Sequence, residues 1–226
     1  MRNKIELILI ILLIIGLVFL NRNIWETVAS GNVKAKENVV VLDPGHGGED
    51  PGKVGVNNEL EKDINLAIAK KVKAYLEKEK IEVILTREED QMLSSANSTN
   101  KKVEDMKERV RIIDESNAAL AISIHQNSYQ DSSVKGAQVF YYTHSQTAEK
   151  YATLMQKALL VVDESNTRQA KSNETYYMLK RTKIPTIIVE CGFLSSPDEA
   201  EKLSTEEYQD EMAKAITEGI IACLAD

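Results

Sequence analysis

The sequence is poor in the residues that build disulfide-rich, collagen-like or low-complexity proteins. Its 226 residues include only two cysteines, four prolines and ten glycines. Two cysteines are too few for a disulfide framework, and neither Cys191 nor Cys223 stands in a CxxC or CxxxH spacing that would suggest a thiolate metal site. We interpret both as small buried hydrophobic residues, because free cysteine is usually interior, with a bond between them as the alternative.

An excess of basic residues is also absent. The chain has 28 Lys and Arg against 35 Asp and Glu, which gives a formal net charge of -7. Affinity for nucleic acid rests mainly on clustered Lys and Arg, so no nucleic-acid partner is expected. The hydrophobic fraction of 43% and the charged fraction of 28% are typical of a folded soluble chain, and the length suits one domain.

One long apolar run stands at the N-terminal end. Residues 7–20 (LILIILLIIGLVFL) carry no charge and follow Arg2 and Lys4. Their length is at the boundary between a secretory h-region, about 7 to 15 residues, and a spanning helix, about 17 to 25 residues, and Ile5, Ile24 and Trp25 could lengthen the run to a span. We interpret residues 1–25 as a signal-anchor or transmembrane segment, 26–38 as a linker and 39–226 as a globular domain held outside the cytoplasm at the membrane.

Two alternatives for this segment stay open. Val28-Ala29-Ser30 is a passable small-residue cleavage site, so a removed signal peptide is the first. A buried core helix is the second.

Apolar runs of strand length alternate with helical patterns in the rest of the chain. The run at 39–42 is continuously apolar, as in a strand buried on both faces, and 59–79 shows helical spacing after the possible caps Asn57 and Asn58. The alternation predicts an α/β fold, a single domain with a twisted, mostly parallel or mixed β-sheet and helices on both faces. The expected strands are 39–42, 81–86, 120–124, 137–142, 176–179 and 187–190, and the expected helices are 59–79, 103–113, 146–162 and 205–224.

Three residues with useful chemistry stand at the carboxyl ends of predicted strands: His46, His125 and Glu190. Ligands of α/β sheets bind beyond that edge, so we expect these side chains to converge. Catalytic zinc commonly takes three protein ligands, often two histidines and a carboxylate. Glu61 is the candidate carboxylate, because it lies in the first turn of the helix after the glycine-rich corner and off its apolar stripe.

Each residue also has a plainer interpretation when taken singly. The histidines could be satisfied polar residues at strand ends, Glu61 could complement a helix N-terminus, and Glu190 could form a structural salt bridge. Beside a metal, Glu190 would instead suit a general base that takes a proton from water and passes it to a leaving group. Cys191 as a nucleophile with His125 as its base is disfavoured, since no residue near Cys191 in sequence would lower its pKa.

A phosphate-binding loop is the competing interpretation of the glycine-rich corner. Residues 47–53 (GGEDPGK) fit the GxxxxGK frame after a strand, but the required Ser or Thr is replaced by Val54, which has no hydroxyl for Mg²⁺. Glu49 and Asp50 would also repel phosphate groups. Nucleotide binding is therefore not expected.

Several short motifs occur together in an order that resembles the zinc-dependent N-acetylmuramoyl-L-alanine amidases of the amidase_3 family. The resemblance extends from Val39 to the C-terminus, and several motifs in the right order are far more specific than one. They are 43–48 (DPGHGG), 50–52 (DPG), 61–63 (EKD) with 65–66 (NL), 86–87 (TR) with Asp90, 123–127 (SIHQN), and 190–195 (ECGFLS) with Glu199.

The resemblance implies one Zn²⁺ ion held by His46, Glu61 and His125, with Glu190 as the catalytic carboxylate. It makes residues 39–226 a zinc amidase catalytic domain with a mixed sheet covered on both sides. The implied substrate is peptidoglycan, and the bond cut is the amide between the lactyl group of N-acetylmuramic acid and L-alanine of the stem peptide.

The layout of an anchor, a brief linker and a bare catalytic domain resembles the spore-cortex, germination-specific members of that family, which act in forming muramic-δ-lactam. A division or autolytic amidase is the other enzyme of this type, and an activating protein partner is possible. Lys180 and Ser196 depart from the family pattern, which expects arginine and asparagine, and this bears on substrate preference. A zinc exopeptidase or a non-catalytic wall-binding domain of similar fold are alternatives from other classes.

Overall fold

The computed structural model describes residues 36–226. The predicted signal-anchor at 1–25 and nearly all of the predicted linker at 26–38 lie outside the described residues. None of the helices within residues 36–226 combines the length and the hydropathy of a membrane span. The first strand begins at Lys36, somewhat earlier than the predicted start at Val39.

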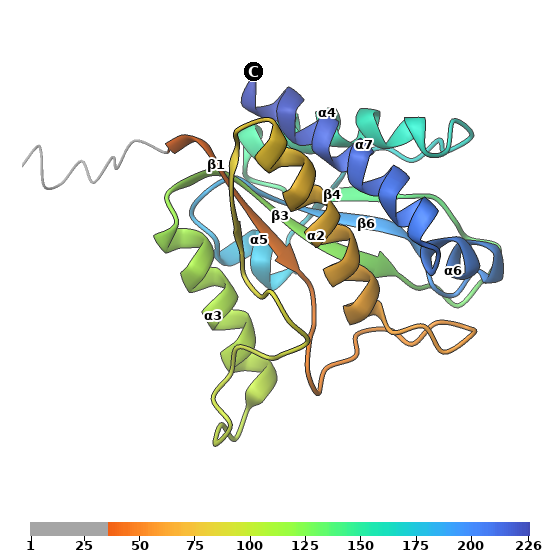
Figure 1. Ribbon diagram of the computed structural model, residues 1–226, viewed down its shortest axis with the longest axis horizontal. Coiled ribbons are helices and arrows are strands. Elements are labelled where there is room, and N and C mark those ends of the chain that lie inside the picture. The colour runs from red at the N-terminus through yellow and green to blue at the C-terminus, as the bar shows by residue number, and fades with distance from the viewer. Residues whose placement is uncertain (1–35) are drawn as a thin grey trace, which may run out of the picture. The chain divides into compact units, whose positions relative to one another are not determined.

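A six-stranded mixed sheet runs through the middle of this part of the chain (Figure 1). Its order is β2-β1-β3-β6-β4-β5, in which β2, β1, β3 and β6 are parallel, β4 is antiparallel to β6, and β5 is parallel to β4. The strands are β1 Lys36–Pro44, β2 Glu82–Leu85, β3 Ala118–Asn127, β4 Gln138–Tyr142, β5 Lys171–Asn173 and β6 Thr186–Phe193.

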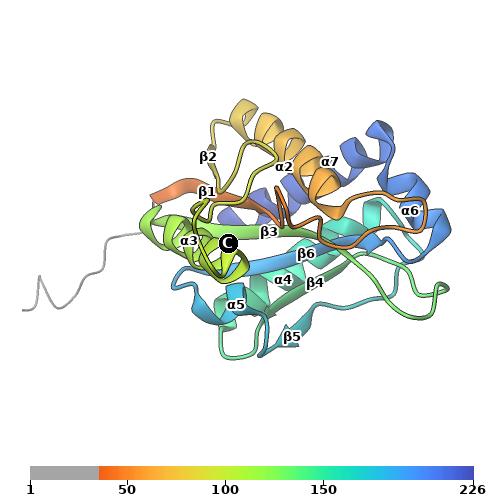
Figure 2. The same ribbon diagram turned by 90° about the horizontal axis from the view of Figure 1, so that it is seen from below.

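Helices cover both faces of the sheet (Figure 2). One face carries α2 Glu61–Lys78, α4 Gln146–Ala158 and α7 Glu206–Leu224, and the other carries α3 Lys101–Glu115 and the short α5 Tyr177–Arg181. A 3₁₀ turn, Leu159–Val161, extends α4, and α6 Pro197–Leu203 follows β6. The predicted α/β class with helices on both faces is confirmed.

Strand β1 shows why the sequences of the central strands are continuous apolar runs. Successive side chains of a strand point to opposite faces, and both faces here are covered. Val40 and Leu42 belong to the large apolar cluster that includes α2, α4 and α7, whereas Val39 and Val41 belong to a smaller cluster with residues of α3. Helices on both sides therefore bury every residue from Val39 to Leu42.

Two local predictions are wrong. The segment predicted as a strand at 176–179 is the start of α5, because the side chain of Asn173 accepts hydrogen bonds from the backbone N–H groups of Thr175 and Tyr176 and turns the chain into a helix. The short strand lies earlier, at β5. Neither Asn57 nor Asn58 caps α2, whose N-cap is Leu60 without a side-chain bond. Helix α6 was not predicted.

Candidate active site

His46 follows β1 in a backbone conformation that L-residues seldom adopt. Its φ is 62°, in the left-handed region. The ring Nδ1 is 2.9 Å from Oδ2 of Asp50, and the backbone carbonyl accepts a hydrogen bond from Nη2 of Arg109 at 2.6 Å. Asp50 thereby fixes the orientation of the ring and leaves Nε2 as the free ligand atom.

Glu61, the first residue of α2, lies between the two histidines. Its Oε1 atom is 3.3 Å from Nε2 of His46 and 2.9 Å from Nδ1 of His125, and its Oε2 atom accepts the N–H of Lys53 at 2.7 Å. Burial opposes ionisation, but hydrogen bonds with His125 and His46 outweigh it and hold the pKa of Glu61 far below its ordinary value. The carboxyl group is therefore an anion near neutral pH.

His125 lies within β3, two residues before the strand ends, and opposite Glu190 of β6. Burial lowers its pKa, but the hydrogen bond and charge of Glu61 outweigh burial, so the net shift is upward. The ring packs directly over Gly45, where a Cβ atom would meet three ring atoms at 2.2 to 2.7 Å. Only glycine at position 45 leaves room for this ring.

These three side chains could hold a metal ion. One ligand atom from each of His46, Glu61 and His125 lies within 4.8 Å of the other two. Two imidazole nitrogens and one carboxylate form a donor set that zinc accepts. The donor set and the spacing fit such an ion, and the anionic Glu61 would attract it.

Glu190 lies beside this cluster with an unused acceptor. Its side chain is 8% exposed, and its Oε2 atom is buried without a hydrogen-bond partner among residues 36–226. Burial raises the pKa of Glu190 to about 7, opposed by the nearby His125. A carboxyl group with a pKa near neutrality can exchange a proton with a reactant in either direction.

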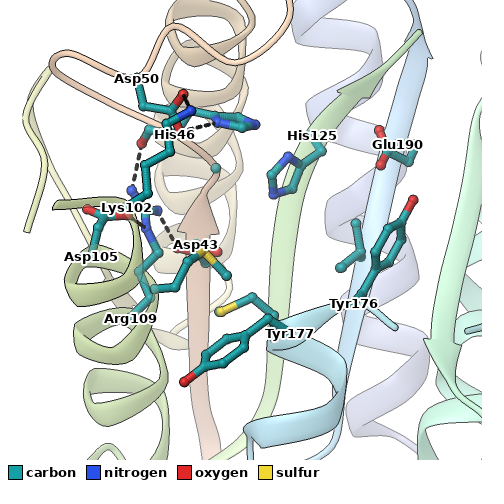
Figure 3. Close-up of a pocket in the computed structure, with 14 residues that line it drawn as sticks. Asp43, His46, Asp50, Lys102, Asp105, Arg109, His125, Tyr176, Tyr177 and Glu190 are labelled. Atoms are coloured by element: carbon teal, nitrogen blue, oxygen red, sulfur yellow. Dashed lines mark hydrogen bonds and ion pairs between the residues drawn. The ribbon is translucent and has the colours of Figure 1, made fainter. Parts of the chain in front are cut away.

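A cavity of about 360 Å³ opens beside His46, His125 and Glu190 (Figure 3). Its walls come from α3 and from the start of α5, and its floor comes from the sheet. The other lining residues are Asp43, Gly45, Asp50, Lys102, Asp105, Met106, Arg109, Tyr176, Tyr177, Met178 and Ile188. The cavity gives a substrate room to lie against the cluster.

The alternative in which Cys191 is the nucleophile is wrong. Cys191 follows Glu190 on β6 and therefore points to the opposite face of the sheet, into the large apolar cluster. Burial raises the pKa of its thiol well above the ordinary value. Both Cys191 and Cys223 are buried and free of disulfide bonds.

Asp43 makes its hydrogen bonds with residues other than the histidines. Its carboxylate accepts hydrogen bonds from Thr86, Ser123 and Arg109 at 2.6 to 2.7 Å. Burial opposes ionisation, but Arg109 and the two hydroxyls outweigh it and hold the pKa of Asp43 below its ordinary value. The carboxylate of Asp43 is therefore taken up by these three donors, whereas Asp50 lies against a candidate ligand ring, that of His46.

Replacing Gly45 with alanine should weaken metal binding. The new Cβ would displace the ring of His125, and we expect the zinc affinity to fall roughly tenfold or more, as when a supporting residue of a metal site is lost. Isothermal titration with Zn²⁺ would measure it. Gly55→Ala is the matched control, because its Cβ would meet the carboxylate end of Glu59, a flexible side chain outside the candidate metal cluster. Equal affinities in both variants would contradict the prediction.

Known proteins resemble this chain over most of its length. Residues 40–222 match the family Amidase_3, described as N-acetylmuramoyl-L-alanine amidase. The chain is 37% identical to the germination-specific N-acetylmuramoyl-L-alanine amidase of Bacillus subtilis (strain 168), over 98% of this chain and 95% of that protein. It is 32% identical to the N-acetylmuramoyl-L-alanine amidase LytC of the same organism, over 81% of this chain and 35% of that protein.

Solved structures agree with these sequence matches. The CwlD amidase from Clostridioides difficile, in complex with the GerS lipoprotein, matches with a TM-score of 0.81 and 40% identity over 83% of this chain and 98% of that chain. The catalytic domain of CwlV from Bacillus (Paenibacillus) polymyxa var. colistinus matches with a TM-score of 0.74 and 31% identity over 83% and 98%. The range matched by the family contains His46, Glu61, His125 and Glu190.

Proposed function

The chain belongs to the Amidase_3 family of N-acetylmuramoyl-L-alanine amidases, and from that premise we propose that it is a zinc-dependent peptidoglycan hydrolase. The bond cut is the amide between the lactyl group of N-acetylmuramic acid and L-alanine of the stem peptide. One observation carries the proposal: His46, Glu61 and His125 converge at a cavity beside Glu190, whose Oε2 atom is buried and unpartnered among the described residues.

In this mechanism His46, Glu61 and His125 would hold one zinc ion, and Glu190 moves the proton. A bound zinc ion supplies Lewis acidity, which polarises a carbonyl group and makes water more acidic. Glu190 takes a proton from the water as its oxygen attacks the lactyl carbonyl carbon. Glu190 then gives this proton to the alanine nitrogen as the C–N bond breaks, which leaves a lactyl carboxylic acid, with the second proton of the water, and a free amine.

We assign this activity to the spore cortex, in the formation of muramic-δ-lactam. Support comes from the identity with the germination-specific amidase along nearly the full length of both chains. A lipoprotein partner is also proposed, because the similar CwlD amidase was solved in complex with one. The hydrolysis would take place outside the cytoplasm, with residues 1–25 as the membrane anchor.

The test is to incubate the purified protein with peptidoglycan and, separately, with free stem peptides. The proposal expects intact stem peptides that begin with L-alanine, together with new lactyl carboxyl groups on the glycan. Release of single residues from free peptides would instead indicate an exopeptidase, and binding to the wall without cleavage would indicate a non-catalytic domain. Cortex peptidoglycan and vegetative wall, compared as substrates, separate the cortex role from a division or autolytic role.

Metal removal should abolish cleavage reversibly. Dialysis against a zinc chelator should stop peptide release, and added Zn²⁺ should restore it. In His125→Ala, zinc should restore little activity, because one of the three ligand atoms is gone. His144→Ala is the matched control, since His144 is exposed and packs edge-on against Tyr142, outside the cluster. Full activity of a protein shown by elemental analysis to be free of metal would refute the metal's role.

A further inference from the structure

Tyr176 places a hydroxyl group close to Glu190. Its ring packs edge-on against Phe140 of β4, with ring centroids 5.4 Å apart, and belongs to the small apolar cluster that contains Ile188 of β6. Ile188 and Glu190 are two apart on β6, so their side chains share one face of the sheet. A ring that lies over Ile188 can therefore direct its hydroxyl along the strand to Glu190, as Figure 3 shows.

The backbone of Tyr176 is held in place as well. Its N–H donates to Oδ1 of Asn173 at 2.8 Å, and its carbonyl accepts the N–H of Lys180 in the first turn of α5. The side chain is half-buried at the cavity wall. The hydroxyl group of Tyr176 therefore needs little reorganisation to contact a substrate in the cavity.

The hydroxyl of Tyr176 is also a free donor. In the hydrogen bonds made by residues 36–226, it has no partner, and only burial and the charges of Glu190 and Glu61 act on its pKa, which they raise. The phenol therefore keeps its proton near neutral pH. The cationic donors of the cavity wall are committed elsewhere, Lys102 to Asp50 at 2.9 Å and Arg109 to Asp43 at 2.7 Å.

Resting on the amide hydrolysis proposed above, we propose that Tyr176 is a catalytic residue whose hydroxyl donates a hydrogen bond to the oxygen of the scissile lactyl carbonyl. Glu190 accepts and returns the proton of the water, so it cannot also serve that oxygen. Negative charge develops on the carbonyl oxygen as the C–O bond to water forms. A positioned neutral donor is worth most at that moment.

The variant Tyr176→Phe tests this, because it removes one oxygen atom and keeps the ring that packs on Phe140. We expect kcat to fall roughly 100-fold with little change in KM, as when one donor to a developing oxyanion is lost. The affinity for a phosphinate analogue of the amide, which resembles the tetrahedral transition state, should fall by a similar factor. Zinc affinity and the melting temperature should stay at wild-type values.

Tyr142→Phe is the matched control. Tyr142 belongs to the same small apolar cluster as Tyr176 but does not line the cavity, so the loss of its hydroxyl should leave kcat at the wild-type value. Wild-type kcat in Tyr176→Phe would overturn the proposal, as would a change in KM alone or a loss of zinc, which would show a role in binding or structure. If the wild-type protein releases no stem peptide, the proposed function fails; if it does and Tyr176→Phe is equally active, only the role of Tyr176 fails.

Discussion

Replacing Glu190 with glutamine should lower kcat for amide cleavage roughly 10²- to 10⁴-fold, the usual contribution of a positioned general acid–base group. Glutamine keeps the shape of the side chain but cannot take a proton from water. The substitution breaks no hydrogen bond at Oε2, which has no partner within residues 36–226. Zinc affinity should be retained, because Glu190 is outside the cluster that could hold the metal. Steady-state kinetics and zinc titration on the same preparation would measure both.

Glu49→Gln is the control for this variant. Glu49 lies on the glycine-rich corner near His46, but it is exposed and pairs with Lys101 at 2.7 Å. Its replacement should leave kcat at the wild-type value. Full activity of Glu190→Gln would remove Glu190 from the mechanism.

The raised pKa of Glu190 gives this position two opposite dependences on pH. A base must be ionised, so wild-type kcat should fall as the pH drops through the pKa of Glu190. This pKa is about 7 in the metal-free protein, and a bound cation would move it to lower pH. The contribution of Glu190 to the stability of the metal-free protein has the opposite dependence and increases as the pH falls. Because the pKa is raised on folding, the contribution of the protonated carboxyl is present below the ordinary value of 4.5 and is lost as the pH rises through about 7. Metal-free Glu190→Gln should therefore melt no lower than wild type at pH 8, and a lower melting temperature would contradict this.

The sequence predicts those site residues that stand out from their local pattern. His125 and Glu190 each directly follow an apolar run, so each is conspicuous on a strand buried from both sides. The topology of a parallel sheet then brings them to adjacent strands, where they are direct neighbours in the register. Both the α/β class and the proximity of His125 to Glu190 therefore follow from local sequence patterns.

Arg109 could not be identified in the same way. It lies on a helix rich in charged residues, and the segment Glu108-Arg109-Val110-Arg111 does not distinguish its two arginines. Burial does distinguish them, since Arg109 is 1% exposed whereas the side chain of Arg111 is 52% exposed. The faint signal in the sequence is that Arg109 falls three residues after Met106, on the face of the helix that packs inward.

Tyr176 was missed for a related reason. Its segment has aromatic and apolar residues that suit a strand, but the side chain of Asn173 bonds two backbone N–H groups and starts a helix there instead. Which way a short segment turns depends on such single hydrogen bonds and on packing against distant strands. Residue propensities over five positions do not resolve that choice.

Arg109 joins the corner that carries His46 to the rest of the fold. Its guanidinium group donates to the carboxylates of Asp43 and Asp105 at 2.7 and 2.6 Å, and to the backbone carbonyls of Pro44 and His46 at 2.8 and 2.6 Å. One buried cation thus satisfies two carboxylates and holds the strained backbone of His46. Removing it leaves the buried carboxylate of Asp43 without its cation, although Thr86 and Ser123 still donate to it, and this is far more costly than losing an exposed ion pair.

Replacing Arg109 with methionine should therefore lower the free energy of unfolding by about 3–5 kcal/mol, as when one partner of a buried ion pair is removed. Chemical denaturation at several pH values would measure it.

In wild type the pKa of Asp43 is lowered on folding, so its contribution to stability is present above the ordinary value of 3.8 and is lost as the pH falls through the folded pKa. Without Arg109 the pKa of Asp43 is higher than in wild type, because burial is then opposed only by Ser123, Thr86 and His125, so the difference in stability between variant and wild type should narrow as the pH falls through the pKa of Asp43 in the variant. Arg111→Met, which removes a cation paired only with the exposed Glu108 and Glu115 of the same helix, should leave the melting temperature unchanged. Equal stability of Arg109→Met and Arg111→Met would show that the buried network does not hold the His46 corner.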